Sequence, residues 1–306
     1  MKSYIQKPSN INKSQFEKHN FSLSSQDYHK LLCLNTNCKP LTDFIIEEKQ
    51  GREIGSENYC DIKKYRFLKT ANITDNYLID YTSEEYCIPI HNIKPKENDI
   101  LIAKDGNGAG LGESCLCNGK SQDDIISSGI LCLTLKPESL YYNYAFIKSQ
   151  LFKNFIDINT AEGSTIRHSK KIALEFQIPF PKNEDTIKQV SEITQNIIDK
   201  ELNIRLKNEK IDKMIEEELM NNQGDKVFKY TCPTINEIKA ENRFDTGLYS
   251  EEYKKTKFLI ENYKGGGGGG GLVLIFIMVV IFYLKKMIYK EGIHLNKEFL
   301  GKVIYG

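Results

Sequence analysis

A long amphipathic pattern over residues 184–221 is the strongest regular signal in the distribution of apolar and polar residues along the chain. Its apolar residues recur at steps of three, four or seven, which places them on one stripe of a helix. The stripe consists of Ile187, Val190, Ile193, Ile197, Ile204, Ile211 and Ile215. Asn183 can cap this helix, and Glu184 and Asp185 suit its first turn because the helix dipole favours acidic groups there. At ~1.5 Å per residue the helix would be roughly 55 Å long, so we expect a partner helix beside it and a role as a spacer or docking arm.

Residues 21–181 carry shorter patterns, which predict a compact domain. Segments with alternating side chains or short apolar runs predict the strands Tyr65–Ile73, Asp99–Ala103, Ser127–Leu135 and Ala173–Pro181. Helical spacing predicts the helices Phe21–Leu34 and Asn143–Ile158, while Pro40–Glu48 suits a helix or a strand. Strands and helices in this irregular order predict an α+β (mixed α/β) domain followed by one long helix.

The domain organisation follows from these patterns. We expect a loose N-terminus over residues 1–20, the domain over 21–181 and the spacer helix over 182–222. Residues 230–264 come next, and Asn242–Tyr253 within them partly echoes the segment that begins at Phe21. This imperfect repeat predicts the start of a second copy of the domain.

The tail over residues 265–306 leaves two hypotheses open. The glycine run Gly265–Gly271 is followed by the apolar segment Leu272–Leu284. That segment could be a membrane anchor, although as a helix it covers only about 20 Å of the ~30 Å hydrocarbon core. Alternatively, the glycine codons are prone to slippage and the sequence after them is read out of frame.

Composition and charge narrow the classes of function. The net charge of +1 gives no overall basicity, so binding to nucleic acid has to rest on local patches. The eight cysteines form no CxxC pair and the five histidines no HExxH motif, so we expect reduced thiols, no metal and no cofactor. The polar first 21 residues predict no signal peptide and a cytoplasmic location. Because no Asn/Asp-Pro-Pro-aromatic methyltransferase motif occurs, we predict a non-catalytic binding protein without a small-molecule substrate.

Two loops are candidates for contact with nucleic acid. Lys104–Gly112 is glycine-rich but lacks a GK[ST] ending, which argues against a phosphate-binding loop. It is either a tight turn between strands or a place where the backbone approaches DNA, with Lys104 and Asn107 as contacts. Gly163–Lys171 offers charges for phosphates and hydroxyl groups for base edges, unless it is simply a solvated loop. Its candidate residues are Ser164, Thr165, Arg167, His168, Lys170 and Lys171.

Several segments between about Asp43 and Leu219 occur in a recognisable order. They are Tyr65–Ile73 (YRFLKTANI), Glu97–Gly112 (ENDILIAKDGNGAGLG), Tyr142–Phe155 (YNYAFIKSQLFKNF), the loop with Gly163, Ser164, Ile166 and Ser169, and Ile178–Pro181 (IPFP) with Glu184 and Ile187. In the order of these segments the chain resembles the specificity subunit of type I restriction–modification systems, although Glu97 and Asn98 stand where that family usually has glycine.

The resemblance implies a target-recognition domain that reads one half of a bipartite site in double-stranded DNA. The long helix would set the distance to the other half and dock methyltransferase (M) subunits through its stripe, with restriction (R) subunits as further partners. It implies no catalytic activity in this chain. The expected DNA contacts are Lys69, Thr70, Asn72, Lys104, Asn107, Ser164, Thr165, Arg167, His168 and Lys170.

Only one recognition domain is complete, so several interpretations stay open. The chain is either a truncated, inactive product or a half-subunit whose long helix pairs with that of a second copy. Outside this family, the alternatives are a coiled-coil adaptor that does not bind DNA and a protein anchored in the membrane through residues 272–284.

Overall fold

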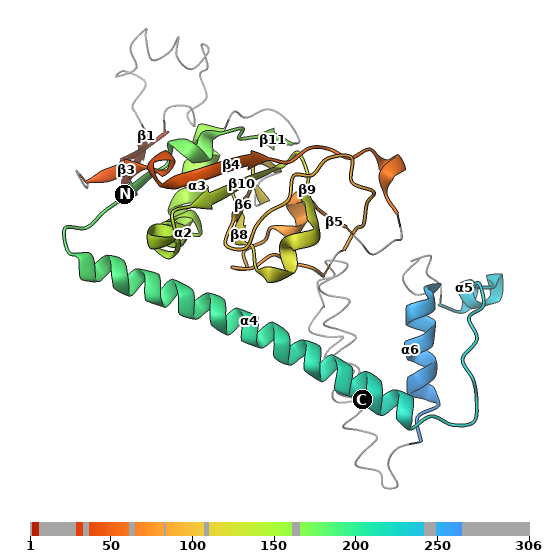
Figure 1. Cartoon of the computed structure of the whole chain (residues 1–306). Helices are drawn as coiled ribbons and strands as arrows, with labels where there is room; N and C mark the ends of the chain where they lie inside the picture. The colour runs from red at the N-terminus through yellow and green to blue at the C-terminus, as the bar shows by residue number, and fades with distance from the viewer. Residues whose placement is uncertain are drawn as a thin grey trace. The chain divides into compact units, whose positions relative to one another are not determined.

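The computed structural model describes residues 2–5, 29–32, 37–60, 65–82, 84–106, 110–160, 166–241 and 249–264. The chain divides into two compact units, Met1–Leu202 and Asn203–Gly306, which we call unit 1 and unit 2. Unit 1 is a mixed α/β domain together with the first part of the long helix that follows this domain in the chain (Figure 1). This confirms the predicted fold class. The predicted domain boundaries stay a prediction.

The described elements of unit 1 are mostly short strands. They are β1 (Lys2–Ile5), β2 (His29–Leu32), β3 (Cys38–Pro40), β4 (Ile45–Gln50), β5 (Arg66–Leu68), β6 (Ile100–Ala103), β7 (Asp105–Gly106), β8 (Ser114–Leu116), β9 (Asp124–Ile126), β10 (Ile130–Leu135), β11 (Arg167–His168) and β12 (Gln177–Pro179). The helices are α2 (Leu140–Ile147), α3 (Gln150–Asn159) and α4 (Glu184–Asn221), which begins in unit 1 and ends in unit 2. Unit 2 also contains α5 (Ile235–Glu241) and α6 (Glu251–Glu261).

The centre of unit 1 is an antiparallel sheet with the strand order β4-β10-β6-β8. Strand β6 is buried along its whole length, as its apolar sequence predicts. Ile100 and Ile102 belong to a core shared with α2 and α3, while Leu101 and Ala103 belong to a second core. The second core also contains three buried thiols, those of Cys115, Cys117 and Cys132.

The turn before β6 contains a residue with a left-handed backbone. Asn98 has a φ of 69°, in the left-handed region that glycine adopts most readily. Asparagine is among the few other residues that adopt it at modest cost. Asn98 therefore lets the chain turn into β6 without a glycine at this position.

The predicted helix Asn143–Ile158 is wrong in one respect, because the segment forms two helices that break at Lys148 and Ser149. The buried Lys148 ammonium donates hydrogen bonds to the carbonyl oxygens of Thr74 (2.9 Å) and Ser114 (2.7 Å). Ser149 then adopts an extended conformation at the N-cap of α3. The Ser149 hydroxyl donates to the Phe146 carbonyl oxygen at 2.6 Å, at the end of α2, and makes no cap hydrogen bond to α3.

Four further predictions need correction. The predicted strand Ala173–Pro181 is strand only over Gln177–Pro179, after a 3-10 turn at Ile172–Glu175, and the predicted strand Ser127–Leu135 begins only at Ile130. His29–Leu32 is not helical but forms β2, which pairs with β1 in antiparallel register. The predicted strand Tyr65–Ile73 is strand only over Arg66–Leu68, because Thr70–Asn72 forms a 3-10 turn.

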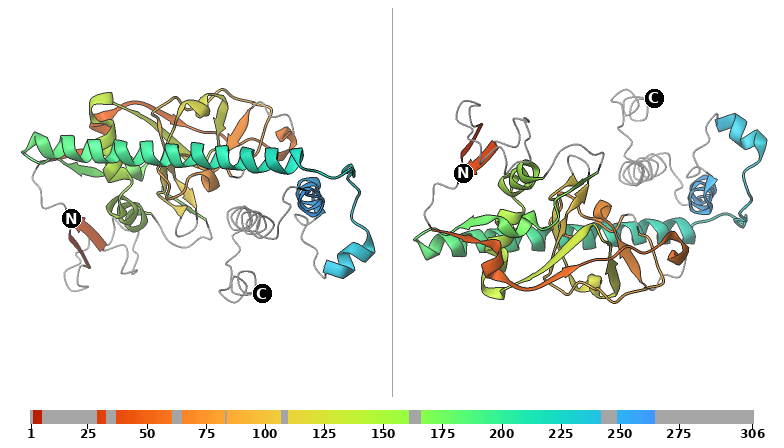
Figure 2. Two further views of the ribbon diagram at one scale, coloured as in Figure 1. Left: turned by 90° about the horizontal axis from the view of Figure 1, so that it is seen from below. Right: turned by 90° about the horizontal axis from the view of Figure 1, so that it is seen from above.

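Helix α4 has the bounds that its pattern predicts, Glu184 to Asn221. The Asn183 side chain accepts a hydrogen bond from the Asp185 amide at 2.9 Å, as expected of the cap. Within unit 1 the helix runs alongside the domain (Figures 1 and 2), and the Glu201 carboxylate accepts hydrogen bonds from the amides of Tyr77 (2.8 Å) and Leu78 (3.2 Å). The part of the helix that belongs to unit 1 is therefore fixed to the domain.

Unit 2 consists mainly of the end of α4 and the helices that follow. Phe228 contacts Phe258 with ring centroids 5.5 Å apart, and the Tyr263 hydroxyl donates a 2.6 Å hydrogen bond to Glu218. Among the described residues, no helix is long and apolar enough to cross a membrane. The glycine run and the apolar segment that suggested an anchor lie outside the described residues.

Candidate nucleic-acid interface

The two loops that the sequence singled out lie side by side. Strand β7, from the glycine-rich segment, pairs with β11, from the basic segment, in antiparallel register. The Ser169 amide and hydroxyl both donate to the Lys104 carbonyl oxygen, at 2.8 Å and 3.0 Å. Residues 65 positions apart in the chain are thereby joined at one edge of the domain.

The 3-10 turn Thr70–Asn72, a third candidate segment, lies close to β7 beside Gly129. The Lys104 amide donates to the Gly129 carbonyl oxygen at 2.9 Å. A Cβ atom at Gly129 would lie 2.9 Å from Cγ2 of Thr70 and 3.4 Å from Cβ of Asp105. The absence of a side chain at Gly129 lets the 3-10 turn that carries Thr70 approach β7 closely.

Asp105 and His168 form the polar centre of this region. His168 Nδ1 lies 2.9 Å from Asp105 Oδ1, and Lys104 Nζ lies 3.9 Å from Asp105 Oδ2. The His168 side chain is 60% exposed, whereas Lys104 is 11% exposed. Lys104 therefore offsets the charge of Asp105 from inside the domain, and the histidine ring faces solvent.

Arg167, a predicted DNA contact, has its guanidinium engaged within the domain. It contacts the Asp157 carboxylate and donates to the carbonyl oxygens of Asp157 (2.6 Å) and Thr160 (2.7 Å). These groups lie at the C-terminal end of α3, where carbonyl oxygens lack helical partners. The guanidinium caps that helix end, so contact with a base edge would require it to release these partners.

Lys69 and Asn72 are also engaged within unit 1. The buried Asn72 side chain accepts from the Lys69 amide and donates to the Asp80 carbonyl oxygen, both at 2.9 Å. Lys69 Nζ lies 2.5 Å from Glu85 and 4.7 Å from the centre of the Tyr59 ring. Burial alone would lower the pKa of Lys69, but Glu85 and Tyr59 raise it above its ordinary value. Both residues shape the turn that presents Thr70.

The lysines of the basic loop differ in their partners. Lys171 Nζ lies 2.8 Å from Glu48 Oε1. Lys170 is exposed, has a left-handed backbone with a φ of 49°, and has no ionic partner among the described residues. Asn107, Ser164 and Thr165, which the sequence also predicts as contacts, lie outside the described residues.

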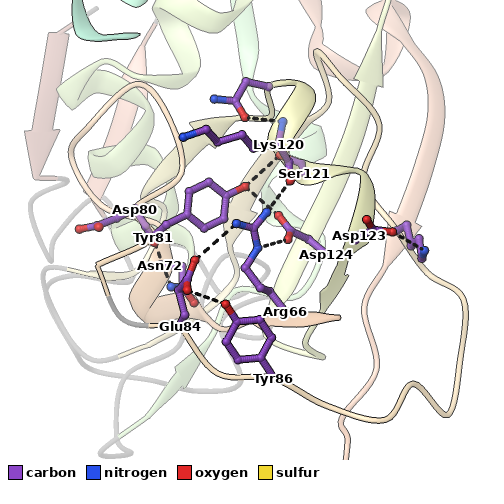
Figure 3. A network of polar contacts seen from close by, with 12 residues as sticks. Arg66, Asn72, Asp80, Tyr81, Glu84, Tyr86, Lys120, Ser121, Asp123 and Asp124 are labelled. Atoms are coloured by element: carbon purple, nitrogen blue, oxygen red, sulfur yellow. Dashed lines mark hydrogen bonds and ion pairs between the residues drawn. The ribbon is translucent and has the colours of Figure 1, made fainter. Parts of the chain in front are cut away.

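A buried ion pair between Arg66 and Asp124 lies beside the strand that leads into the 3-10 turn Thr70–Asn72 (Figure 3). Arg66 Nε donates to Asp124 Oδ1 and the Tyr81 hydroxyl donates to Asp124 Oδ2, both at 2.7 Å. Asp124 is fully buried, and burial raises the pKa of Tyr81 well above its ordinary value. This network ties β5 to its parallel neighbour β9 and so fixes the start of the 3-10 turn.

Sequence reasoning missed Asp105 and Arg66. An acidic residue beside DNA is unexpected because phosphates repel it, and only the structure brings His168 opposite Asp105. The signal for Arg66 was present, since a charged residue within a strand-like apolar segment requires a buried partner.

Some residues of the predicted interface stripe on α4 pack against unit 1, and others are exposed. Ile187 and Val190 pack against the core of unit 1, so in this structure they are covered by the domain itself. Ile193 and Ile197 are exposed in unit 1, and Ile204 and Ile211 in unit 2. Ile215 is half-buried. An exposed stripe is left, with isoleucines spaced seven residues apart from 197 to 211, which is typical of a coiled-coil seam.

Comparison with solved structures finds specificity subunits of type I restriction–modification systems. The S subunit from M. genitalium is 19% identical, with a TM-score of 0.42, over 62% of this chain and 47% of that one. The HsdS subunit from Thermoanaerobacter tengcongensis is 14% identical, with a TM-score of 0.33, over 56% and 39%. A chain from a structural study of complex assembly in the type I R-M system is 16% identical, with a TM-score of 0.36, over 66% and 50%.

This chain spans half or less of the length of each of those structures. No family model matches the sequence. No curated protein matches it either.

Proposed function

We propose that this chain is a DNA-recognition chain of a type I restriction–modification system. Unit 1 binds one half of a bipartite site in double-stranded DNA. The chain is not catalytic, needs no cofactor and acts in the cytoplasm beside its M subunits, with R subunits joining the same complex. The pairing of β7 with β11 carries this proposal, because it joins two sequence segments that were independently candidates for DNA contact.

The surface chemistry at this edge suits duplex DNA. Exposed Lys170 provides a charge for phosphate, and His168 and Thr70 provide groups that can hydrogen-bond to base edges or phosphates. Gly106 and Gly129 keep the backbone of the edge free of side chains. Phosphate contacts would position the domain, while the hydrogen-bonding side chains would read the sequence.

The exposed apolar stripe of α4 supports the second part of the proposal, the docking of a partner helix. Exposed isoleucines at seven-residue spacing favour a coiled coil with an M subunit or with a second copy of this chain. Two copies would read a palindromic bipartite site.

The direct test is binding to duplex DNA by the purified full chain, measured by fluorescence anisotropy at several salt concentrations. Lys170→Ala should weaken binding to all sequences and reduce the salt dependence, as expected for a lost phosphate contact. The matched control is Lys136→Ala, because Lys136 follows β10 whereas Gly129 precedes it, and six strand residues separate the two ends by about 20 Å.

Binding that is absent at low salt, or equally affected by both substitutions, would contradict the DNA-reading role. Gel filtration with a type I M subunit tests the docking role separately. A chain that binds the M subunit but no DNA would instead be the coiled-coil adaptor. Methylome mapping in cells with and without the chain then tests the complete system.

A further inference from the structure

The hydrogen bond between Asp105 and His168 selects one tautomer of the neutral histidine ring. An ionised carboxylate only accepts hydrogen bonds, so the proton between Asp105 Oδ1 and His168 Nδ1, 2.9 Å apart, belongs to the ring. In a neutral imidazole with its proton on Nδ1, Nε2 carries a lone pair and accepts. The ring is 60% exposed, so Nε2 is available to a ligand.

The pair is held by the backbone rather than by flexible side chains alone. His168 lies directly opposite Asp105 in the β7–β11 register. Both hydrogen bonds from Ser169 to the Lys104 carbonyl oxygen lock the neighbouring positions. Lys104 Nζ, 3.9 Å from Asp105 Oδ2, offsets the carboxylate charge that would otherwise repel DNA.

We propose that His168 is a base-reading residue, and that Asp105 is the positioning residue that fixes its tautomer. Nε2 of His168 accepts a hydrogen bond from an exocyclic amino group, N6 of adenine or N4 of cytosine, in the major groove of duplex DNA. These are the donors that the major groove presents at base edges. The inference rests on the proposed function and deepens it, because it assigns a chemical class to one position of the target.

The neutral ring with its proton on Nδ1 does not bind a phosphate through Nε2. Phosphate oxygens are acceptors, and in this tautomer Nε2 carries a lone pair and has no proton to donate to them. At this edge Lys170, rather than His168, would contact phosphate. Substitution of the two residues should therefore have different consequences, one for specificity and one for overall affinity.

The experiment selects duplexes from a randomised library with the full chain and with the variants His168→Ala, Asp105→Ala and Asp105→Asn. The wild type should enrich a motif, and His168→Ala should lose about 2- to 10-fold of its discrimination at one adenine or cytosine, as expected for one hydrogen bond. Asp105→Ala should lose discrimination at the same position, because the ring can then carry its proton on either nitrogen. Asp105→Asn should largely retain it, because the amide oxygen still accepts from Nδ1.

A base analogue then tests the amino group itself. At the affected position, replacing adenine by purine, or cytosine by its 4-deamino analogue, should weaken wild-type binding by a similar factor. It should leave binding by His168→Ala unchanged. Nitrogen chemical shifts of the ring, assigned by comparison with His168→Gln, should show the proton on Nδ1 and a bare Nε2 in the free protein.

The possible failures are distinct. A motif that survives unchanged in His168→Ala overturns this inference and leaves the proposed function standing. The same holds for a uniform loss of affinity over all sequences, or for a ring with its proton on Nε2. If the wild type enriches no motif, the proposed function fails and the base-reading assignment fails with it.

Discussion

Replacing Asp99 by alanine should unfold unit 1 far more readily than any change at its surface. The Asp99 carboxylate is fully buried at the start of β6. It accepts hydrogen bonds from the Thr134 hydroxyl (2.6 Å), the Lys96 amide (2.8 Å) and Lys49 Nζ (3.2 Å), and the Cys132 thiol lies 3.3 Å away. One side chain thus joins three strands of the central sheet and the turn before β6.

The size of the expected loss of stability follows from the number of these hydrogen-bond partners and from their burial. Removing one member of a buried, hydrogen-bonded ion pair costs about 3–5 kcal/mol. Lys49 keeps only 15% of its side chain exposed, so water replaces its lost partner poorly. For a domain of this size each kcal/mol lowers the melting temperature by about 2–4 °C, so we expect a fall of roughly 10 °C.

Thermal and urea unfolding followed by circular dichroism measure the loss. The matched control is Glu47→Gln, which leaves Asp99 in place. It removes the pair between Glu47 and Lys96, with side chains 42% and 66% exposed, and the longer 3.6 Å pair between Glu47 and Lys49. Exposed pairs contribute about 0–1 kcal/mol, so the control should stay near the wild type. An Asp99→Ala protein within about 1 kcal/mol of the wild type would refute the reasoning.

The pH dependence offers a second readout of the same group. Burial alone would raise the pKa of Asp99, but hydrogen bonds from Thr134, the Lys96 amide, Cys132 and Lys49 bring it below its ordinary value of 3.8. A carboxyl group whose pKa is lower in the folded state stabilises the protein above the unfolded value, and this contribution is lost as pH falls through the folded value. Wild-type stability should therefore drop in acid below pH 3.8, and Asp99→Asn should remove this part of the drop.

Three further substitutions test other parts of the structure. Gly129→Ala should cost about 1–3 kcal/mol in urea unfolding, because the new methyl group would collide with Thr70, and should also weaken DNA binding measured by anisotropy. Lys170→Gly should raise the free energy of unfolding by up to about 1 kcal/mol, because glycine adopts the left-handed backbone more easily, while DNA affinity falls. Glu201→Ala should cost about 1–3 kcal/mol, because it leaves the amides of residues 77–78 without their acceptor, and an unchanged melting curve would contradict the anchoring of α4.

The elements that could be predicted from the sequence are those with strong local signals. The α4 helix carries its own cap and an unbroken apolar period, and its bounds agree with the prediction. Strand β6 is a short, continuous apolar run and is buried as expected. The break between α2 and α3 interrupts an apolar pattern that continues at helical spacing, and Lys148 at the break donates to carbonyl oxygens of Thr74 and Ser114, far away in the sequence.

The candidate site shows more clearly that tertiary contacts cannot be predicted from local sequence. Sequence reasoning found the two loops because their composition is unusual, but it could not tell which cations have internal partners. Arg167 reads as a DNA contact from its charge alone, yet its guanidinium is held by groups at the end of α3. Asp105 was overlooked, because only the β7–β11 pairing brings it to His168. The sequence shows which residues are charged, whereas the tertiary contacts decide whether a charged group is available to bind DNA.

The buried thiols of the second core can be used to detect local unfolding of unit 1. Cys115, Cys117 and Cys132 are inaccessible in the closed sheet, and burial raises the pKa of Cys117 and Cys132. Cys232, in unit 2, is exposed. An alkylating reagent should therefore mark Cys232 at once and reach the three sheet thiols only when the strands separate. Counting modified sulfurs by mass spectrometry would time those openings without any added probe.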